Sequence, residues 1–462
     1  MKRIPNHSFK SFFKLISVIS LIAIIVCSSG CISGGDGDTD DTNGDEGVTL
    51  TVITRHDTSI QEAFEEGFLD SDYAKDANIT KLRFMQPVSG LWPTAIENGG
   101  IDVAWGGGPT LFDQLMELDY LAPLTEDILP EMADIEDSIG GAAMKRYSDG
   151  EVVWIAAAIS SFGFTVNHDV LDAYGLDTPD TWDDLADLSY YKDPPVIGIG
   201  NAPDTTSNTR IYEIILQNYG WDLGWEKLTE IAANSGIYYG SVDVLNAVET
   251  GTIAIGTTID FYGYSSMESY DYTEYIIPTG QSLLNGDPIA LVEGSEKTEA
   301  ALAFIGYVLS PEGQSIWLLD NINRMPVTDA AFDTEFGMTR TNLEELYNIT
   351  ISNQGIEFSE NLALSYEGTM VIYWEAVLDK PHNELVAAWD ALIDAWNEGK
   401  ITQAQWDHYV EMLGEPLITM ETAQDINDSM LMDSAFANDK SVEWANEKQE
   451  VYEQVKDEID NL

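Results

Sequence analysis

The sequence predicts an α/β protein of two lobes, joined by two crossovers and extended by helices at its C-terminal end. Short apolar segments rich in β-branched residues alternate with helical segments between residues 48 and 330. The apolar stretch 152–166 is too long for one ordinary strand, which predicts a crossing from one lobe to another. Beyond residue 340 the spacing of apolar residues is typical of helices.

Residues 1–30 have the pattern of an export signal. Four cations and no acids precede an apolar run, 15–26, and small residues follow it before Cys31. Such a run is too short to cross about 30 Å of hydrocarbon as a helix. The acidic, Gly-rich segment 31–47 is expected to form a flexible linker. The mature chain is therefore expected to work outside the cytoplasm.

The junction at Cys31 resembles a lipoprotein signal, in which this Cys becomes the lipidated first residue. Ser28 departs from that pattern, because such signals usually carry Leu there. An ordinary cleaved signal with an incidental Cys is the alternative. Lipid attachment would anchor the protein to the outer face of the cell membrane.

Composition excludes several classes of protein. The only other cysteine is Cys27, so the mature chain has no disulfide and requires an apolar core, which its 44 % hydrophobic content can supply. Removing residues 1–30 leaves 17 Lys and Arg against 80 Asp and Glu, a net charge of −63. The acids are spread along the chain, which indicates a solvated surface suited to high salt. Nucleic acid is excluded as a partner because no cluster of cations is present.

The first lobe is expected to contain a parallel sheet. Predicted strands at 48–54, 81–85 and 101–105 alternate with a helix at 60–69 and a second helix that Thr110 can cap. Ligands of such sheets bind at the carboxyl ends of the strands. This places a candidate site at the loops that follow Thr54 and Trp105.

The second lobe is expected to repeat this alternation. The stretch 152–166 is predicted to break at Ser160–Gly163 into a strand leaving the first lobe and a strand entering the second. Further strands are predicted at 196–200, 253–259 and 272–278, a helix at 225–233, a polar loop at 203–209, a second crossover at 286–291, and a helix at 297–309. The expected organisation is a signal at 1–30, a linker at 31–47, lobe one at 48–158 and 285–345, lobe two at 159–284, and a helical extension at 346–462.

These segments together resemble the extracellular solute-binding proteins of ABC importers. The resemblance is carried by the order and spacing of short motifs between about 48 and 330, among them Asp102-Val-Ala-Trp-Gly-Gly, Pro179-Asp-Thr-Trp-Asp-Asp-Leu, Gly251-Thr-Ile-Ala-Ile-Gly and Asn323-Arg-Met-Pro-Val. It implies the two-lobed periplasmic-binding-protein-like type II fold, in the branch that binds ferric iron or small anions. It further implies a monomer without cofactor or enzymatic activity, which captures a solute between its lobes for a membrane permease.

The iron binders of that family use a His after the first strand, a carboxylate after the third, and adjacent tyrosines in the second lobe. His56 and Tyr262 fall at two of these positions. Gly106–Gly108 stand where the carboxylate is expected, and Phe261 and Gly263 flank Tyr262. The missing ligands weaken the prediction of a ferric site, because ferric iron favours phenolate and carboxylate oxygens.

Hydrogen-bond donors favour an anion or oxyanion instead. Arg55 offers a guanidinium, Gly106–Gly108 offer backbone N–H groups before a helix, and the 206–209 loop offers hydroxyls and an amide. We expect no catalytic residue and no metal, unless His56 and Tyr262 hold iron. The candidate ligand-binding residues are Arg55, His56, Trp105, Gly106, Gly107, Gly108, Ser160, Ser161, Thr206, Ser207, Asn208, Asp260, Tyr262 and Tyr264.

The C-terminal residues beyond 340 lie outside this resemblance. Helices are predicted at 385–396, 403–413 and 441–459. They form either an enlarged flank of one lobe or a separate module that contacts the permease or another partner. Three glycosylation sequons begin at Asn78, Asn348 and Asn427.

Two other functions remain as alternatives. A surface sensor of the same fold would have its closed form recognised by a receptor instead of a permease. A secreted hydrolase is disfavoured, because the sequence has no His-Glu-x-x-His helix and no Gly-x-Ser-x-Gly elbow.

Overall fold

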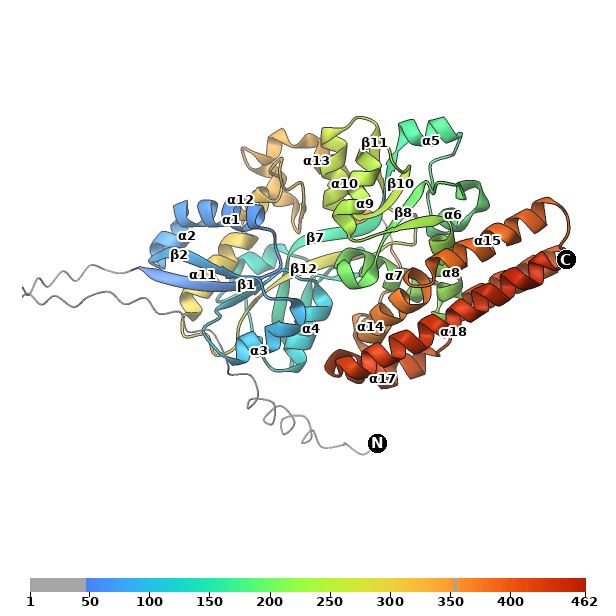
Figure 1. Cartoon of the computed structure of the whole chain (residues 1–462). Coiled ribbons are helices and arrows are strands. Elements are labelled where there is room, and N and C mark those ends of the chain that lie inside the picture. Colours follow the sequence, from blue (N-terminus) through green and yellow to red (C-terminus); the bar gives the residue numbers. More distant parts are fainter. Residues whose placement is uncertain (1–46, 353–354) are drawn as a thin grey trace, which may run out of the picture. The chain divides into compact units, whose positions relative to one another are not determined.

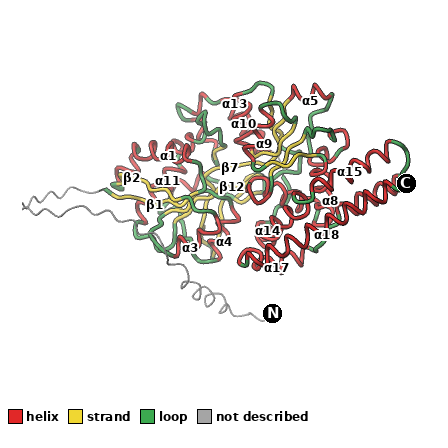
Figure 2. Tube along the Cα trace, viewed as in Figure 1, coloured by secondary structure: helices red, strands yellow, loops and turns green. Residues whose placement is uncertain are grey.

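The computed structural model describes residues 47–352 and 355–462 (Figure 1). The predicted signal 1–30, Cys31 and the linker up to residue 46 lie outside the described residues. Helices and strands alternate along most of the described chain, and helices alone make up its C-terminal part (Figure 2). No helix within the described ranges has both the length and the apolar character needed to cross a bilayer.

The first lobe is built on a parallel sheet, as the sequence predicts. Strand β1 lies between β2 and β3 and is parallel to both. Their side chains are held between helices, and the first core includes Phe64, Trp105 and Phe304. The elements are β1 (Val48–Thr54), α1 (Thr58–Asp70), α2 (Asp72–Asp76), β2 (Ile79–Met85), η3 (Ser89–Leu91), α3 (Trp92–Glu97), β3 (Val103–Trp105), α4 (Pro109–Glu117), η4 (Pro130–Asp134), β4 (Ser138–Ile139), β5 (Ala142–Ala143) and β6 (Lys145–Ser148).

A single strand, β7 (Glu151–Asn167), passes from the first lobe into the second. The predicted break at Ser160–Gly163 is wrong, because the backbone stays paired throughout. Up to Ser161 it pairs with β12 (Leu284–Leu291), and from Phe162 onward it pairs with β10 (Ile255–Ile259). The strand therefore changes partner where the sequence predicts a break. Gly163 allows this, because a Cβ there would lie 2.0 Å from the Ile276 carbonyl oxygen.

The second lobe continues the same sheet. Strand β8 is parallel to β9 and β10, whereas β10 and β11 run antiparallel to β7. The elements are α5 (His168–Tyr174), α6 (Trp182–Ala186), η5 (Leu188–Tyr190), β8 (Ile197–Gly200), η6 (Ala202–Asp204), α7 (Thr206–Tyr219), α8 (Trp221–Ala233), β9 (Ser235–Tyr238), α9 (Ser241–Glu249), α10 (Asp260–Ser269) and β11 (Thr273–Ile276). The predicted strands of this lobe are present, at slightly shifted ends, and β9 is an additional one.

The chain returns to the first lobe through β12 and then leaves it again. The returning part contains α11 (Thr298–Leu309), α12 (Pro311–Ile316), β13 (Met325–Pro326), η7 (Asp329–Asp333), η8 (Gly337–Thr339) and α13 (Thr341–Ser352). Leu343 and Tyr347 of α13 belong to the first core. The next helix belongs to the second core, and between them the Ile356 N–H donates to the Ser282 carbonyl at 2.9 Å. A third passage between the lobes therefore accompanies the two that the sequence predicts.

The C-terminal helices share one apolar core with the second lobe. They are α14 (Glu360–Trp374), the π-helical segment η9 (Glu375–Asp379), α15 (His382–Asn397), α16 (Gln403–Gly414), α17 (Met420–Met432) and α18 (Ser434–Asp460). Figure 1 shows α15 beside both α8 and α18. Trp374 stacks on Tyr212 with ring centroids 4.9 Å apart, and Tyr373 meets Trp225 edge to face at 4.7 Å. This continuous core is the packing expected of a flank rather than of an independent module.

This packing buries the predicted glycosylation sequon at Asn427. The Asn427 side chain accepts a hydrogen bond from Thr369 N at 3.0 Å and donates to the Leu364 carbonyl at 3.1 Å. It is only 6 % exposed, so the folded protein cannot present it for glycosylation, and that candidate is corrected. Asn78 and Asn348 are exposed.

We expect Trp374→Ala to lower the free energy of unfolding by about 3–5 kcal/mol, because the ring is fully buried between the extension and the second lobe. Urea unfolding followed by circular dichroism measures this loss. Trp396→Ala is the matched control, since it removes the same side chain from α15 at a site that is 37 % exposed. Equal losses in the two variants would contradict a shared core.

Candidate functional site

Three charged or polar side chains meet where the strands cross between the lobes. His56 follows β1, Asp287 lies within β12, and Arg324 precedes β13. Arg324 Nη2 lies 2.7 Å from Asp287 Oδ2, and Arg324 Nη1 lies 3.3 Å from His56 Nδ1. All three residues are buried. We refer to His56, Asp287 and Arg324 as the hinge cluster.

The hinge cluster continues along β7 through two serines. Arg324 Nη2 donates to Ser160 Oγ at 3.1 Å. Asp260, the first residue of α10, accepts hydrogen bonds from Ser161 N at 2.6 Å and from Phe261 N at 2.8 Å. The structure therefore brings four of the predicted residues together, namely His56, Ser160, Ser161 and Asp260.

The glycine loop after β3 binds a carboxylate of the protein itself. Gly107 N and Gly108 N donate to Asp287 Oδ1 at 3.0 and 3.2 Å. Gly106 needs to be glycine, because its φ is +72° and a Cβ there would lie 2.5 Å from His56 Nε2. The sequence predicts that these N–H groups bind an anion. In the structure they bind the carboxylate of Asp287.

Burial and neighbouring charges fix the charge state of this cluster. Burial alone would raise the pKa of Asp287, but Arg324, His56 and the glycine N–H groups outweigh it and lower the pKa below its ordinary value. Burial lowers the pKa of His56 to about 3, assisted by Arg324 and opposed by Asp287. At neutral pH, Asp287 is therefore a carboxylate and His56 a neutral ring. The 3.6 Å approach of His56 Nε2 to Asp287 is not an ion pair.

Asp260 behaves differently from Asp287. Burial raises the pKa of Asp260 to about 7, although hydrogen bonds from Ser161 and Phe261 and the charge of Arg324 favour its ionised form. Arg324 is engaged by Asp287, so the desolvation of Asp260 is only partly compensated. Asp260 therefore gains or loses its proton near neutral pH.

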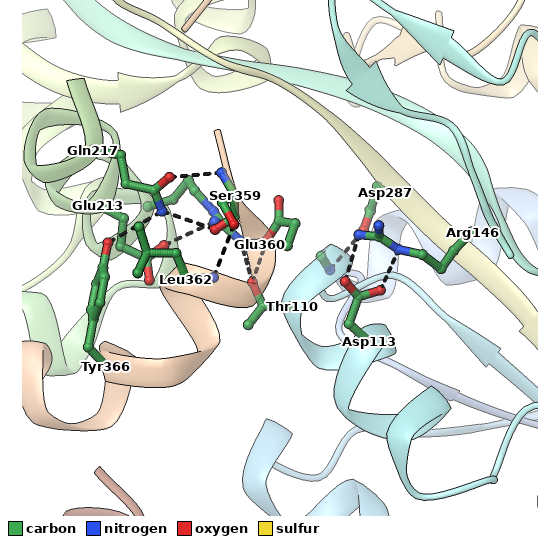
Figure 3. A network of polar contacts seen from close by, with 12 residues as sticks. Thr110, Asp113, Arg146, Glu213, Gln217, Asp287, Ser359, Glu360, Leu362 and Tyr366 are labelled. Atoms are coloured by element: carbon green, nitrogen blue, oxygen red, sulfur yellow. Dashed lines mark hydrogen bonds and ion pairs between the residues drawn. The ribbon is translucent and has the colours of Figure 1, made fainter. Parts of the chain in front are cut away.

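A second polar group bridges the lobes at the N-terminal end of α4 (Figure 3). Thr110 Oγ1 donates to Glu360 Oε2 at 2.8 Å, and Arg210 Nη2 donates to Thr110 Oγ1 at 2.6 Å. Arg210 also lies 3.1 Å from Glu360 Oε2 and 3.1 Å from Glu213 Oε2. These carboxylates, Glu360 first and then Glu213, raise the pKa of Arg210 against the opposing effect of burial. We refer to Thr110, Arg210 and Glu360 as the bridging triad.

Arg55 and Tyr262 lie close to the hinge cluster. Arg55 is exposed, and its stem lies against the glycine loop, since a Cβ at Gly107 would be 3.0 Å from Arg55 Cγ. Tyr262 is partly buried; burial and Asp57 raise its pKa, and Arg324 opposes the rise.

The 206–209 loop serves the inside of the second lobe instead. Asn208 is fully buried; its amide accepts from Gly200 N at 3.1 Å and donates to Ser241 Oγ at 3.0 Å. Ser207 Oγ also meets Ser241 Oγ, at 2.6 Å, whereas Thr206 is exposed. The expected amide donor is thus used to tie α7 to the strand ends, and Asn208 has no free surface for a solute.

Tyr264 and Trp105 are both buried, so neither offers free surface to a solute. Tyr264 is two residues beyond Tyr262 on α10, a rotation of about 200° around the helix, and its hydroxyl meets Thr350 Oγ1 at 3.0 Å. Trp105 is fully buried and packs edge to face on His56 with ring centroids 4.4 Å apart. Trp105 therefore supports His56 from the core.

Sequence reasoning missed Asp287, Arg324 and the bridging triad. Asp287 stands in a buried strand and Arg324 among apolar neighbours, and either mismatch could have marked a site. Within the residues that the structure describes, no group of three or more His, Cys, Asp and Glu is arranged to hold a metal.

Comparison with known proteins identifies the class. The family model for the bacterial extracellular solute-binding protein matches residues 52–315, more than half of the chain. The chain therefore belongs to the bacterial extracellular solute-binding proteins.

Two curated relatives share the name phosphoglycerate transport regulatory protein PgtC, from Salmonella typhimurium strain LT2 and Salmonella typhi. Each is 30 % identical over 234 residues, which cover 50 % of this chain and 55 % of the relative. The chain thus spans about half the length of the curated relatives it matches.

Solved structures share the fold at lower identity. An ABC transporter protein of Clostridium perfringens is 19 % identical with a TM-score of 0.55, covering 71 % of this chain and 99 % of its own. AfuA of Actinobacillus pleuropneumoniae, with fructose-6-phosphate bound, is 19 % identical with a TM-score of 0.50, covering 66 % and 98 %. Iron-bound HitA of Pseudomonas aeruginosa is 19 % identical with a TM-score of 0.51, covering 65 % and 99 %.

The pKa of Asp260 predicts a specific pH dependence of stability. Between its unfolded pKa of about 4 and its folded pKa of about 7, the folded state keeps a proton that the unfolded state has released. Stability therefore falls as pH rises through this window, by up to about 4 kcal/mol. The unfolding free energy is measured at pH 5 and at pH 8. We expect Asp260→Asn to show a smaller fall between these two pH values than the wild type, because the contribution of Asp260 is absent. Asp439→Asn, at an exposed aspartate, should leave the wild-type difference in place.

Proposed function

We propose that the protein captures a small solute carrying a phosphate or carboxylate group between its two lobes, for delivery to an ABC permease. One observation carries the choice of an anion. The N-terminal end of α4 holds two carboxylates of the protein itself, Asp287 on the glycine N–H groups and Glu360 on the Thr110 hydroxyl. Groups that bind carboxylates here suit the same chemistry in a solute.

The named relatives support a phosphate-bearing solute. The curated relatives are named for phosphoglycerate transport, and AfuA holds a sugar phosphate. Ferric iron is less suited to this chain, since Arg324 Nη1 lies 3.3 Å from His56 Nδ1 and would repel a cation bound to that ring. Ferric iron held by His56 and Tyr262 is therefore the second choice.

The same proposal gives the protein's cellular location and its partner, the permease. A lipid on Cys31 would hold the protein at the outer face of the membrane, where the permease accepts the solute, and the protein would act as a monomer. A sensor role is the alternative, and the word "regulatory" in the relatives' name favours it. Solute binding between the lobes is common to both roles.

Binding of 3-phosphoglycerate is expected to raise the melting temperature, because a ligand of the native state stabilises it by about 2.7 kcal/mol at one hundred times its Kd. Arg55→Glu should abolish the shift by placing a carboxylate beside the glycine loop. Arg83→Glu, an equal charge change at an exposed residue of β2, is the control and should retain it. Thermal unfolding is followed at one fixed, high salt concentration, which separates binding from charge screening. Full binding in Arg55→Glu would refute this site.

A further inference from the structure

Glu360 belongs to a part of the chain that lies beyond the family match, which ends at residue 315, and its carboxylate contacts Thr110 and Arg210. It is the first residue of α14, and Figure 3 shows its side chain directed at Thr110. Thr110 belongs to the first lobe, whereas Arg210 and α14 pack with the second. One carboxylate therefore contacts both lobes at once.

The position of Glu360 is fixed by the second lobe. The Gln217 amide of α7 accepts from Ser359 N at 2.8 Å and donates to the Ser359 carbonyl at 3.1 Å. Ser359 in turn caps α14, since its Oγ accepts from Leu362 N at 3.2 Å. A residue held by three hydrogen bonds directly before Glu360 limits where that carboxylate can lie (Figure 3).

The groups that receive Glu360, Thr110 and Arg210, are of the kind that binds an anion. Arg210 has a side chain that is only 9 % exposed, and Glu360 one that is 14 % exposed, so both are largely removed from water. A hydroxyl at a helix N-terminus and a guanidinium together make a site for a carboxylate or a phosphate. Arg210 is also paired with Glu213, and its charge is felt by Glu367. Removing Glu360 therefore leaves Glu213 and Glu367 near Arg210; burial raises the pKa of both carboxyl groups, and the charge of Arg210 opposes that rise.

We propose that Glu360 is an internal ligand of the inter-lobe site: it holds the lobes together when no solute is bound, and the anionic group of the solute displaces it from Thr110 and Arg210. This inference rests on the proposed function for the identity of the competing anion. The contacts of Glu360 with Thr110 and Arg210 must break before the solute binds. Only molecules in which these contacts are broken can bind the solute, so the apparent affinity for the solute falls in proportion to their fraction.

The first test needs no solute. Glu62→Cys on α1 and Asp243→Cys on α9 place spin labels on the two lobes of the full chain, after Cys27 and Cys31, its two native cysteines, are changed to Ser. Glu360→Gln should lengthen or broaden the distance distribution of the solute-free protein. Glu421→Gln, an equal charge change in the first turn of α17, is the matched control and should not. Thr110→Val removes the partner hydroxyl and should act like Glu360→Gln. Unchanged distributions in both bridging variants would overturn the proposal.

The second test measures affinity for 3-phosphoglycerate and inorganic phosphate by calorimetry at fixed ionic strength. Glu360→Gln should bind about tenfold more tightly than wild type, since a hydrogen bond to a charged group contributes roughly that factor or more. Weaker binding would show that Glu360 contacts the solute, and an equal gain in Glu421→Gln would reveal a general charge effect; either result overturns the proposal. If neither probe binds any variant, the proposed anion function fails, and the label distances still decide the role of Glu360.

Discussion

The buried ion pair between Arg324 and Asp287 is the contact on which the hinge depends. Removing one partner of such a pair costs about 3–5 kcal/mol, because the other charge is left without compensation. Here each partner also serves further groups: Arg324 reaches His56 and Ser160, and Asp287 accepts from the Gly107 and Gly108 N–H groups. One pair thereby ties the loops that follow β1 and β3 to the interiors of β7 and β12. Those two loops are fixed in place by it.

The scarcity of cations explains where they are found. With 80 acids in the chain, exposed carboxylates can remain solvated, but a carboxylate that is buried needs a counter-charge. Arginines supply that charge inside the fold, as in Arg146 with Asp113, Arg210 with Glu213 and Arg324 with Asp287. These three arginines therefore lie where a buried carboxylate needs a counter-charge, and two of the pairs lie at the boundary between the lobes.

The C-terminal helices have two relations to the rest of the molecule. Their aromatic side chains complete the core of the second lobe, as the stacking of Trp374 on Tyr212 illustrates. Their first residue, Glu360, reaches the first lobe through Thr110. An addition that packs on one lobe and touches the other is well placed to influence closure, because closure depends on the balance of contacts between open and closed states.

By itself, the sequence determined the α/β alternation, the two lobes, the crossing near Ser160 and Ser161, and the importance of the loops after β1 and β3. These follow from local hydrophobic spacing and from the rule that parallel sheets bind ligands at their carboxyl ends. Only the tertiary structure decided which donors are free and which are used. The sequence offers Asn208 and Gly107 equally as donors to a solute, yet the folded protein uses both internally. The Asn208 amide donates to Ser241 Oγ and accepts from Gly200 N, and Gly107 N donates to Asp287, 180 residues away. Glu360 could not be found among 80 acids, because the partner of a carboxylate is set by long-range packing and leaves no periodic trace in the chain.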